Sequence, residues 1–233
     1  MKRNTVLESK GHIPAVPERP TTTAKSRSRG KLAPRKDPAQ ERSRETVNAI
    51  LDSAQHILES KGVDELTTHK VAAHAGVGVG SVYDYFSNKH GVLHAMLERW
   101  LNSVNEALEA NSAVSGRFAN WMEYIDSQIS ALLEVYDREP GLAGQYSVIT
   151  AIPALRNLDA RQDQHFIQLQ VTALKHFLPN ADTVDLEIVA LAYLVIVHNI
   201  LKRAVSQPPE RKAKLIRVLR SQIYTLVHSL DRV

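Results

Sequence analysis

The stretch 62–93, GVDELTTHKVAAHAGVGVGSVYDYFSNKHGVL, decides the fold, because two short helical patterns meet in it across a glycine-containing turn. The first pattern begins at Thr67 or Thr68, where a side-chain hydroxyl can cap a helix, and it ends at Gly76. The second begins near Gly80 and is too short to contribute much to a hydrophobic core, so its exposed face is expected to be the functional one. The pattern predicts a helix-turn-helix that reads DNA.

Helical spacing divides each pattern into an inner and an outer face. In the first, the small apolar residues Val71, Ala72 and Ala75 are expected to be buried. In the second, Val82 and Phe86 lie four residues apart and are expected to face inward. The side chains then expected to face outward are Ser81, Tyr83, Asp84 and Tyr85.

Four short motifs in this stretch resemble the TetR family of bacterial transcriptional regulators. They are the LTT of residues 66–68, the VAxxAGV of 71–77, the GSVYxYF of 80–86 and the NKxxVL of 88–93. The resemblance covers roughly residues 43–101, about a quarter of the chain. It implies an all-α protein with a three-helix DNA-binding head and a larger helical domain for ligand binding and dimerisation. Such a protein binds a near-palindromic operator as a homodimer, and a small-molecule effector releases it.

The chain departs from the family pattern at two positions. Gly78 stands where the family usually has Ser or Thr, and glycine caps a helix without a side-chain hydrogen bond. Asp84 adds a carboxylate to the expected DNA-facing surface, where it could accept from a cytosine amino group or point to solvent.

The resemblance and the outer faces together predict the residues at the DNA. Ser81, Tyr83 and Tyr85 are candidates for base or phosphate contacts. Lys89 is expected to bind a phosphate, helped by the positive end of the following helix dipole. The complete expected set is Thr68, His69, Gly80, Ser81, Tyr83, Asp84, Tyr85 and Lys89.

Composition limits the possible classes of protein. A chain of 233 residues with 43% hydrophobic residues can hold a small head and a larger core. It has no Cys, which excludes disulfides and thiolate metal sites. We found no apolar run of transmembrane length and no hydrophobic signal segment, so we expect a soluble cytoplasmic protein with no membrane contact.

Charge is concentrated at the N-terminus. Residues 1–40 contain ten Lys and Arg against three acids, whereas the whole chain has a net charge of only +4. This segment is rich in Pro, Ser and Thr and poor in large apolar residues, so we expect a disordered basic arm. It could follow phosphates or enter a minor groove, or it could have no specific contact. The expected domains are therefore the arm at 1–40, the DNA-binding head at 41–92 and the effector and dimerisation domain at 93–233.

Apolar stripes and breakers predict the remaining helices. We expect one at 41–61, one starting after Asn88 and passing Leu108, one at about 117–135 and a short segment between Pro140 and Pro153. Three more are expected at about 154–177, at 183–203 and after Pro208 and Pro209. The pattern contains no strand signal, so the fold class is all-α.

The helix expected at 183–203 is apolar nearly all round, which indicates burial on more than one side. By resemblance to the family, it would pair with the last helix and with the same two helices of a second subunit. The alternative is the central helix of a monomer. The residues expected in the dimer interface are Leu191, Leu194, Val195, His198, Leu219, Ile223 and Leu226.

Aromatic and polar residues on the helical stripes could line an effector cavity, although plain core would give the same pattern. The candidates are Trp121, Tyr124, Tyr146, Gln162, His165 and Phe166. Because few charges fall on these faces, a neutral or weakly polar effector is expected rather than a dianion.

Other signals of chemistry are weak, and we expect no cofactor and no enzymatic activity. The glycines of 76–80 follow no strand and precede no Lys-Ser or Lys-Thr pair, so they do not form a phosphate loop. His90 and His94 have metal-ligand spacing without a third ligand. Two alternatives remain: a helical enzyme or small-molecule carrier that keeps the helix-turn-helix as scaffold, and a DNA-architectural protein without an effector.

Overall fold

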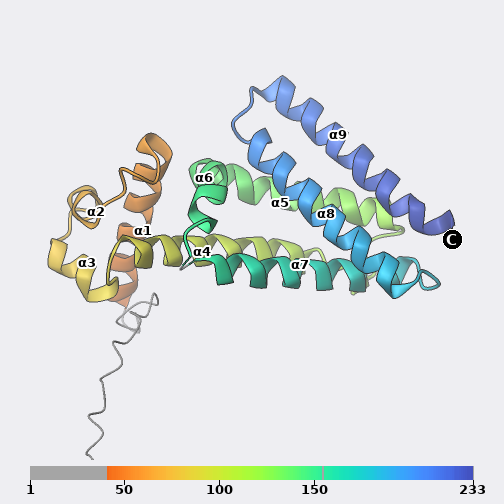
Figure 1. Cartoon of the computed structure of the whole chain (residues 1–233), viewed down its shortest axis with the longest axis horizontal. Coiled ribbons are helices and arrows are strands. Elements are labelled where there is room, and N and C mark those ends of the chain that lie inside the picture. Colours follow the sequence, from red (N-terminus) through yellow and green to blue (C-terminus); the bar gives the residue numbers. More distant parts are fainter. Residues whose placement is uncertain (1–40, 154, 233) are drawn as a thin grey trace, which may run out of the picture.

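The computed structural model describes residues 41–153 and 155–232, and all regular secondary structure in that part is helical. The helices form a small head and an elongated body (Figure 1). Their bounds are α1 Glu41–Lys61, α2 Thr68–Ala75, α3 Val79–Tyr85, α4 Lys89–Ala110, α5 Trp121–Arg138, α6 Pro140–Thr150, α7 Arg156–Phe177, α8 Thr183–Ala204 and α9 Pro209–His228, with short 3₁₀ turns at Ala113–Ser115 and Ser229–Arg232. The all-α prediction is confirmed.

The head consists of α1, α2, α3 and the first turns of α4, and its helix ends follow the predicted capping residues. The Thr67 side chain accepts from the backbone N–H of Lys70, and Gly76 ends α2 with a positive φ of 67°. Gly78 caps α3 without a side-chain hydrogen bond, as expected for glycine. The Asn88 side chain accepts from the first backbone N–H groups of α4. These caps fix where α2 ends and where α3 and α4 begin.

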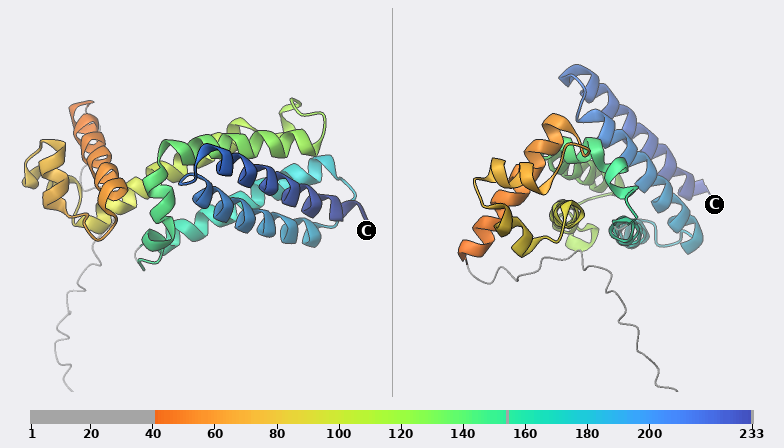
Figure 2. Two further views of the ribbon diagram at one scale, coloured as in Figure 1. Left: turned by 90° about the horizontal axis from the view of Figure 1, so that it is seen from above. Right: turned by 60° about the vertical axis from the view of Figure 1, so that its left-hand side comes forward.

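Helix α4 is continuous from the head into the body. It runs beside α7, and both helices are seen end-on in Figure 2 (right). Gln162 of α7 donates to the side chain of Asn105 of α4 at 2.8 Å. Trp100, in the middle of α4, is 1% exposed. One rigid element therefore joins the head to the interior of the body.

Helix α6 also joins the two parts, because its first turn packs on the last turns of α1. The approach at Gly141 is so close that a Cβ atom there would lie 2.7 Å from Cα of Glu59. The sequence predicted only a short segment bracketed by prolines. The structure makes it a helix because Pro140 stands in its first turn, where the missing N–H costs nothing.

Helices α8 and α9 form an antiparallel pair on one side of the body (Figure 1). By length and composition α8 is the one described helix that could cross a membrane, which corrects the expectation that no apolar run reaches that length. In the monomer 33% of its most apolar stretch is buried. Its exposed apolar residues are Val184, Ile188, Leu191 and Val195, each between 51% and 61% exposed. They follow the spacing 4-3-4, so they lie along one face of the helix. We call these four residues the α8 stripe.

Candidate DNA interface and ligand cavity

The outer face of α3 is exposed to solvent. Tyr83 is 40% exposed although it is a large aromatic residue, and Asp84 and Gly80 are also exposed. Ser81 is half-buried. The Tyr83 hydroxyl shares a hydrogen bond with Oγ1 of Thr68 at 3.1 Å, which ties α3 to the start of α2. A flat aromatic side chain is therefore held in a fixed position on the outer surface.

Two residues expected at the DNA surface are buried instead. Tyr85 is 7% exposed, so the prediction that it faces outward is wrong. The inner face of α3 contains Val82 and Tyr85, and Phe86, just after the helix, is buried beside them, because positions three and four residues apart share a helix face. Thr68 is also only 7% exposed, and its hydroxyl contacts Tyr83. Thr68 thus positions Tyr83 and offers little surface of its own.

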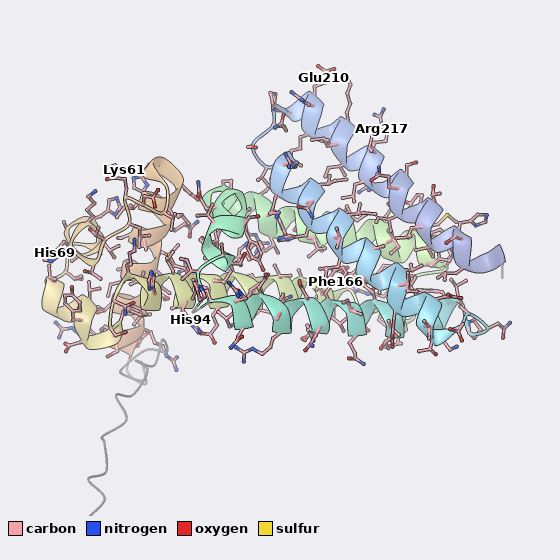
Figure 3. All side chains as sticks on the ribbon, viewed as in Figure 1. Lys61, His69, His94, Phe166, Glu210 and Arg217 are labelled. Carbon is pink, nitrogen blue, oxygen red and sulfur yellow. The ribbon has the colours of Figure 1, made fainter. Side chains whose placement is uncertain are left out.

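Two basic or titratable side chains lie at helix starts near this face. His69, in the first turn of α2, is exposed at the outer edge of the head (Figure 3). Lys89 is half-buried and is the first residue of α4. Backbone N–H groups and the helix dipole make such positions favourable for phosphate oxygens.

The centre of the body contains a small inner cavity of about 30 Å³. A volume of this size holds about one or two water molecules. Aromatic and aliphatic side chains from α4 to α8 surround it, and Phe166 on α7 is labelled in Figure 3. Its polar lining consists of Tyr136, Tyr146, Gln162, Asp163 and His198. Tyr146, Gln162 and Phe166 were predicted from the sequence to line a cavity, and these three do meet here.

Aromatic rings pack tightly around one side of the inner cavity. The Trp100 ring centroid lies 5.0 Å from that of Tyr136 and 5.3 Å from that of Tyr146. The His198 ring lies 4.5 Å from Tyr146, and His198 Nδ1 shares a hydrogen bond with the Tyr136 hydroxyl. Burial, reinforced by the Lys202 charge, lowers the pKa of His198 to about 3. His198 is therefore neutral at pH 7.

Two carboxylates on α7 face these rings. The Tyr146 hydroxyl donates to Asp159. Burial, and then the charge of Asp159, raise the pKa of the Asp163 carboxyl to about 6. The same burial and the nearby acids raise the pKa values of Tyr136 and Tyr146, so both phenols stay protonated. Among residues 41–153 and 155–232, no ion pair involves Asp163.

A larger outer cavity of about 440 Å³ adjoins the inner one, and the two share Tyr146, Asp163, Leu194 and His198 as lining residues. It opens between α6, α7 and α8. Lys202 lies at this cavity, with its ammonium 5.8 Å from the Tyr146 ring centroid and 3.0 Å from Oγ of Ser147. Leu191 and Val195 of the α8 stripe also border the outer cavity.

The other predicted cavity residues lie elsewhere. Trp121 packs edge-on against Tyr224 of α9, with ring centroids 5.8 Å apart. His165 faces Glu109 at 3.7 Å and is partly exposed. Tyr124 borders a separate cavity of about 180 Å³ between α4, α5 and α7, where its hydroxyl donates to the buried Gln170. The structure therefore places three of the six predicted residues away from the inner cavity.

Most residues that line the two cavities were not among those expected from the sequence. They include the aromatic residues Trp100 and Tyr136 and the acids Asp159 and Asp163. One signal was present: Asp159, Asp163 and Phe166 lie on one face of α7 at spacings of four and three. Within the described part of the chain, no group of three His, Asp or Glu side chains could hold a metal ion.

The expected dimer residues divide into two groups. Leu191 and Val195 are half-exposed, and Leu194 and Leu226 are partly buried. Leu219 and Ile223 are fully buried inside the monomer, so their expected place in an interface is wrong. The reason is that this side of α9 packs on α8 of the same chain. His198 is half-buried, and its ring lies at the cavity beside Leu191 and Val195, so its place in an interface stays a prediction.

The chain matches two family models. Residues 50–96 match the model described as "Bacterial regulatory proteins, tetR family", and residues 120–224 match "Tetracyclin repressor-like, C-terminal domain". Together they cover about two thirds of the chain. An HTH-type transcriptional repressor of Mycobacterium tuberculosis is 27% identical over 137 residues, which are 58% of this chain. The chain spans about half the length of the curated relatives it matches.

Solved structures share the fold. A transcriptional regulator from Rhodococcus sp. Rha1 superposes with a TM-score of 0.67 at 20% identity, covering 80% of this chain and 98% of that one. The structure titled as a SmeT–triclosan complex gives a TM-score of 0.58 at 21% identity, covering 77% of this chain and 90% of that one. The arrangement of head and body is thus the same in proteins of low sequence identity.

Proposed function

Since this chain belongs to the TetR family, we propose that it is a ligand-responsive transcriptional repressor that binds operator DNA as a homodimer. The observation that carries the proposal is the exposed outer face of α3, where Tyr83 is held by Thr68 within the part of the chain that matches the DNA-binding family model. The proposed role of the protein is DNA binding rather than catalysis, and the protein is proposed to act in the cytoplasm, where the DNA is.

In the proposed complex, α3 enters the major groove. Ser81, Tyr83 and Asp84 face the bases, and the small Gly80 allows close approach of the backbone. Thr68 acts through Tyr83, and Tyr85 supports the helix from inside. His69 and Lys89 bind phosphates at the starts of α2 and α4.

A second copy of the chain is proposed to cover the α8 stripe. Four half-exposed aliphatic side chains on one face of a helix are costly in water, and an identical stripe is complementary to them. Obligate interfaces of this kind bury more than about 2,000 Å². Two-fold symmetry then sets the operator half-sites about 34 Å apart or a multiple of that distance.

The effector is proposed to enter the outer cavity and open the inner one. The inner cavity is too small for a ligand, so binding must move its walls. Those walls include Trp100 on α4 and Tyr146 on α6, the two helices that connect to the head. Effector binding therefore favours a different placement of the heads, provided that the two states differ in effector affinity.

Selection of bound duplexes from a random DNA pool tests the proposal. We expect a near-palindromic consensus, bound with strong dependence on salt. Binding that is independent of sequence would instead favour an architectural role. Failure to retain DNA at low salt would favour a carrier or an enzyme that keeps the helix-turn-helix as scaffold.

A further inference from the structure

The inner cavity has an unbalanced charge. Of its lining residues, Asp163 is the one acid, and Lys and Arg are missing from the residues that line it. His198 also lines the cavity, and it is neutral because burial lowers its pKa. The inner cavity is thus lined mainly by aromatic and aliphatic side chains, with a few neutral polar groups and a single acidic group.

The outer cavity, which Asp163 also lines, adds Arg156, Asp159 and Lys202, but within the described part of the chain neither cation forms an ion pair with Asp163. Burial lowers the pKa of Lys202, and the charge of Asp159 opposes that shift. Asp159 also accepts from the Tyr146 hydroxyl, so it has both a donor and a nearby cation. For Asp163, burial and the Asp159 charge are the influences on its pKa, and both act against ionisation. A positive charge placed beside Asp163 would reverse that effect.

The ring faces provide a second, independent reason for a cation. Trp100, Tyr136 and Tyr146 line the inner cavity together with Asp163, and the negative face of an aromatic ring attracts cations. The protein already uses one of these rings in that way, since the Lys202 ammonium lies 5.8 Å from the Tyr146 centroid. Lys202 itself makes no ion pair in the described part of the chain.

We propose that the effector is an organic cation, with an ammonium group that binds between Asp163 and the rings of Trp100, Tyr136 and Tyr146, and a remaining part that extends into the outer cavity. This inference rests on the proposed function and replaces the neutral effector expected from the sequence. That expectation did not include Asp159 and Asp163, because the sequence did not show that α7 turns both toward the rings.

A matched series of three probes separates charge from shape. Benzyltrimethylammonium is the cation, neopentylbenzene is its neutral isostere, and phenylacetate carries the opposite charge. Binding to the full chain without DNA is measured by calorimetry and by the fluorescence of Trp100 in a Trp121→Phe background, which leaves one of the two tryptophans. We expect the ammonium to bind about tenfold or more tightly than either other probe.

Two substitutions have opposite expected effects. Asp163→Asn removes the charge with little change of shape and should weaken ammonium binding about tenfold while leaving neopentylbenzene unaffected. Lys202→Gln removes a competing positive charge and should strengthen ammonium binding. Asp185→Asn, the control, changes an acid on a different cavity at the start of α8. If Asp163→Asn fails to fold, Lys202→Gln alone still shows whether the site prefers a positively charged ligand.

Three results would overturn the proposal. They are equal binding of the neutral isostere, phenylacetate binding that Lys202→Gln abolishes, and no ammonium binding at millimolar concentration. The proposed function fails separately: if the ammonium binds as expected but operator affinity does not change, the cation site stands and the regulatory role does not. If the selected operator is released by a neutral compound that binds Asp163→Asn equally well, the regulatory role stands and the cation site does not.

Discussion

Replacing Gly141 by Ala should separate α6 from α1. The added Cβ would lie 1.9 Å from Cγ of Glu59 and 2.7 Å from its Cα. The contact with Cγ could be relieved by rotating the Glu59 side chain. The contact with Cα cannot, because Cα belongs to the backbone of α1, so the two helices must move apart.

The expected cost follows from overpacking. Forcing one extra methyl group into a packed contact costs about 1–3 kcal/mol, and replacing glycine within a helix returns less than about 1 kcal/mol. The net loss of about 1–2 kcal/mol corresponds to a fall in Tm of about 2–8 °C for a domain of this size. Operator affinity should also fall, by about fivefold or more, because α1 belongs to the head.

Gly144→Ala is the matched control in the same helix. No heavy atom lies within 4 Å of the position that its Cβ would take, so the change should stabilise the protein by about 0.5–1 kcal/mol. Thermal unfolding followed by circular dichroism, at one fixed protein concentration, compares the two variants. If Gly141→Ala unfolds at the same temperature as wild type or above it, the close contact between α1 and α6 is not a constraint on the folded protein.

Four further outcomes are expected. Tyr83→Ala and Lys89→Ala should lose operator binding with the fold intact, and loss of Lys89 should lower the salt slope by about one unit; wild-type binding at two salt concentrations would contradict this. Leu191→Glu should yield monomers in sedimentation at micromolar concentration, whereas an unchanged dimer would move the interface elsewhere. The pKa of Asp163 in the folded protein is about 6, above its ordinary value of 3.8, so ionised Asp163 destabilises the fold fully above about pH 6 and hardly at all below about pH 4. Asp163→Asn should therefore raise Tm at pH 7 more than at pH 4. Removing residues 1–38, which lie outside the described residues, should weaken binding to operator and scrambled duplexes by a similar factor, and an unchanged scrambled-DNA affinity would make the arm a bystander.

Local signals in the sequence predicted most of the helices, although α6 was expected only as a short segment. Gly76 and Pro208 mark helix ends through backbone geometry, which depends on few neighbours. The helix expected at about 117–135 begins instead at Trp121, because the Asn120 side chain accepts from the N–H of Glu123 and caps it there. Asn120 could have been recognised as a capping residue from the sequence, but the predicted helix start followed the apolar pattern instead.

The contents of the cavity could not be predicted in the same way. Trp100 and Asp163 are far apart in the sequence, and only the packing of α4 and α7 brings both to one cavity. The same limit explains the errors at Leu219 and Ile223. Periodicity shows that a helix side is apolar, but it does not tell whether that side packs on the same chain or on another.

The position of α8 between the outer cavity and the proposed second copy has a consequence for dose–response measurements. Leu191 and Val195 border the outer cavity and also belong to the α8 stripe, so a partner on that stripe would form part of the surroundings of a bound effector. Linkage then requires that effector affinity and self-association change together. The half-saturating effector concentration should shift as the protein is diluted through its dimer dissociation constant, and a sensor built from this chain would need calibration at its working expression level.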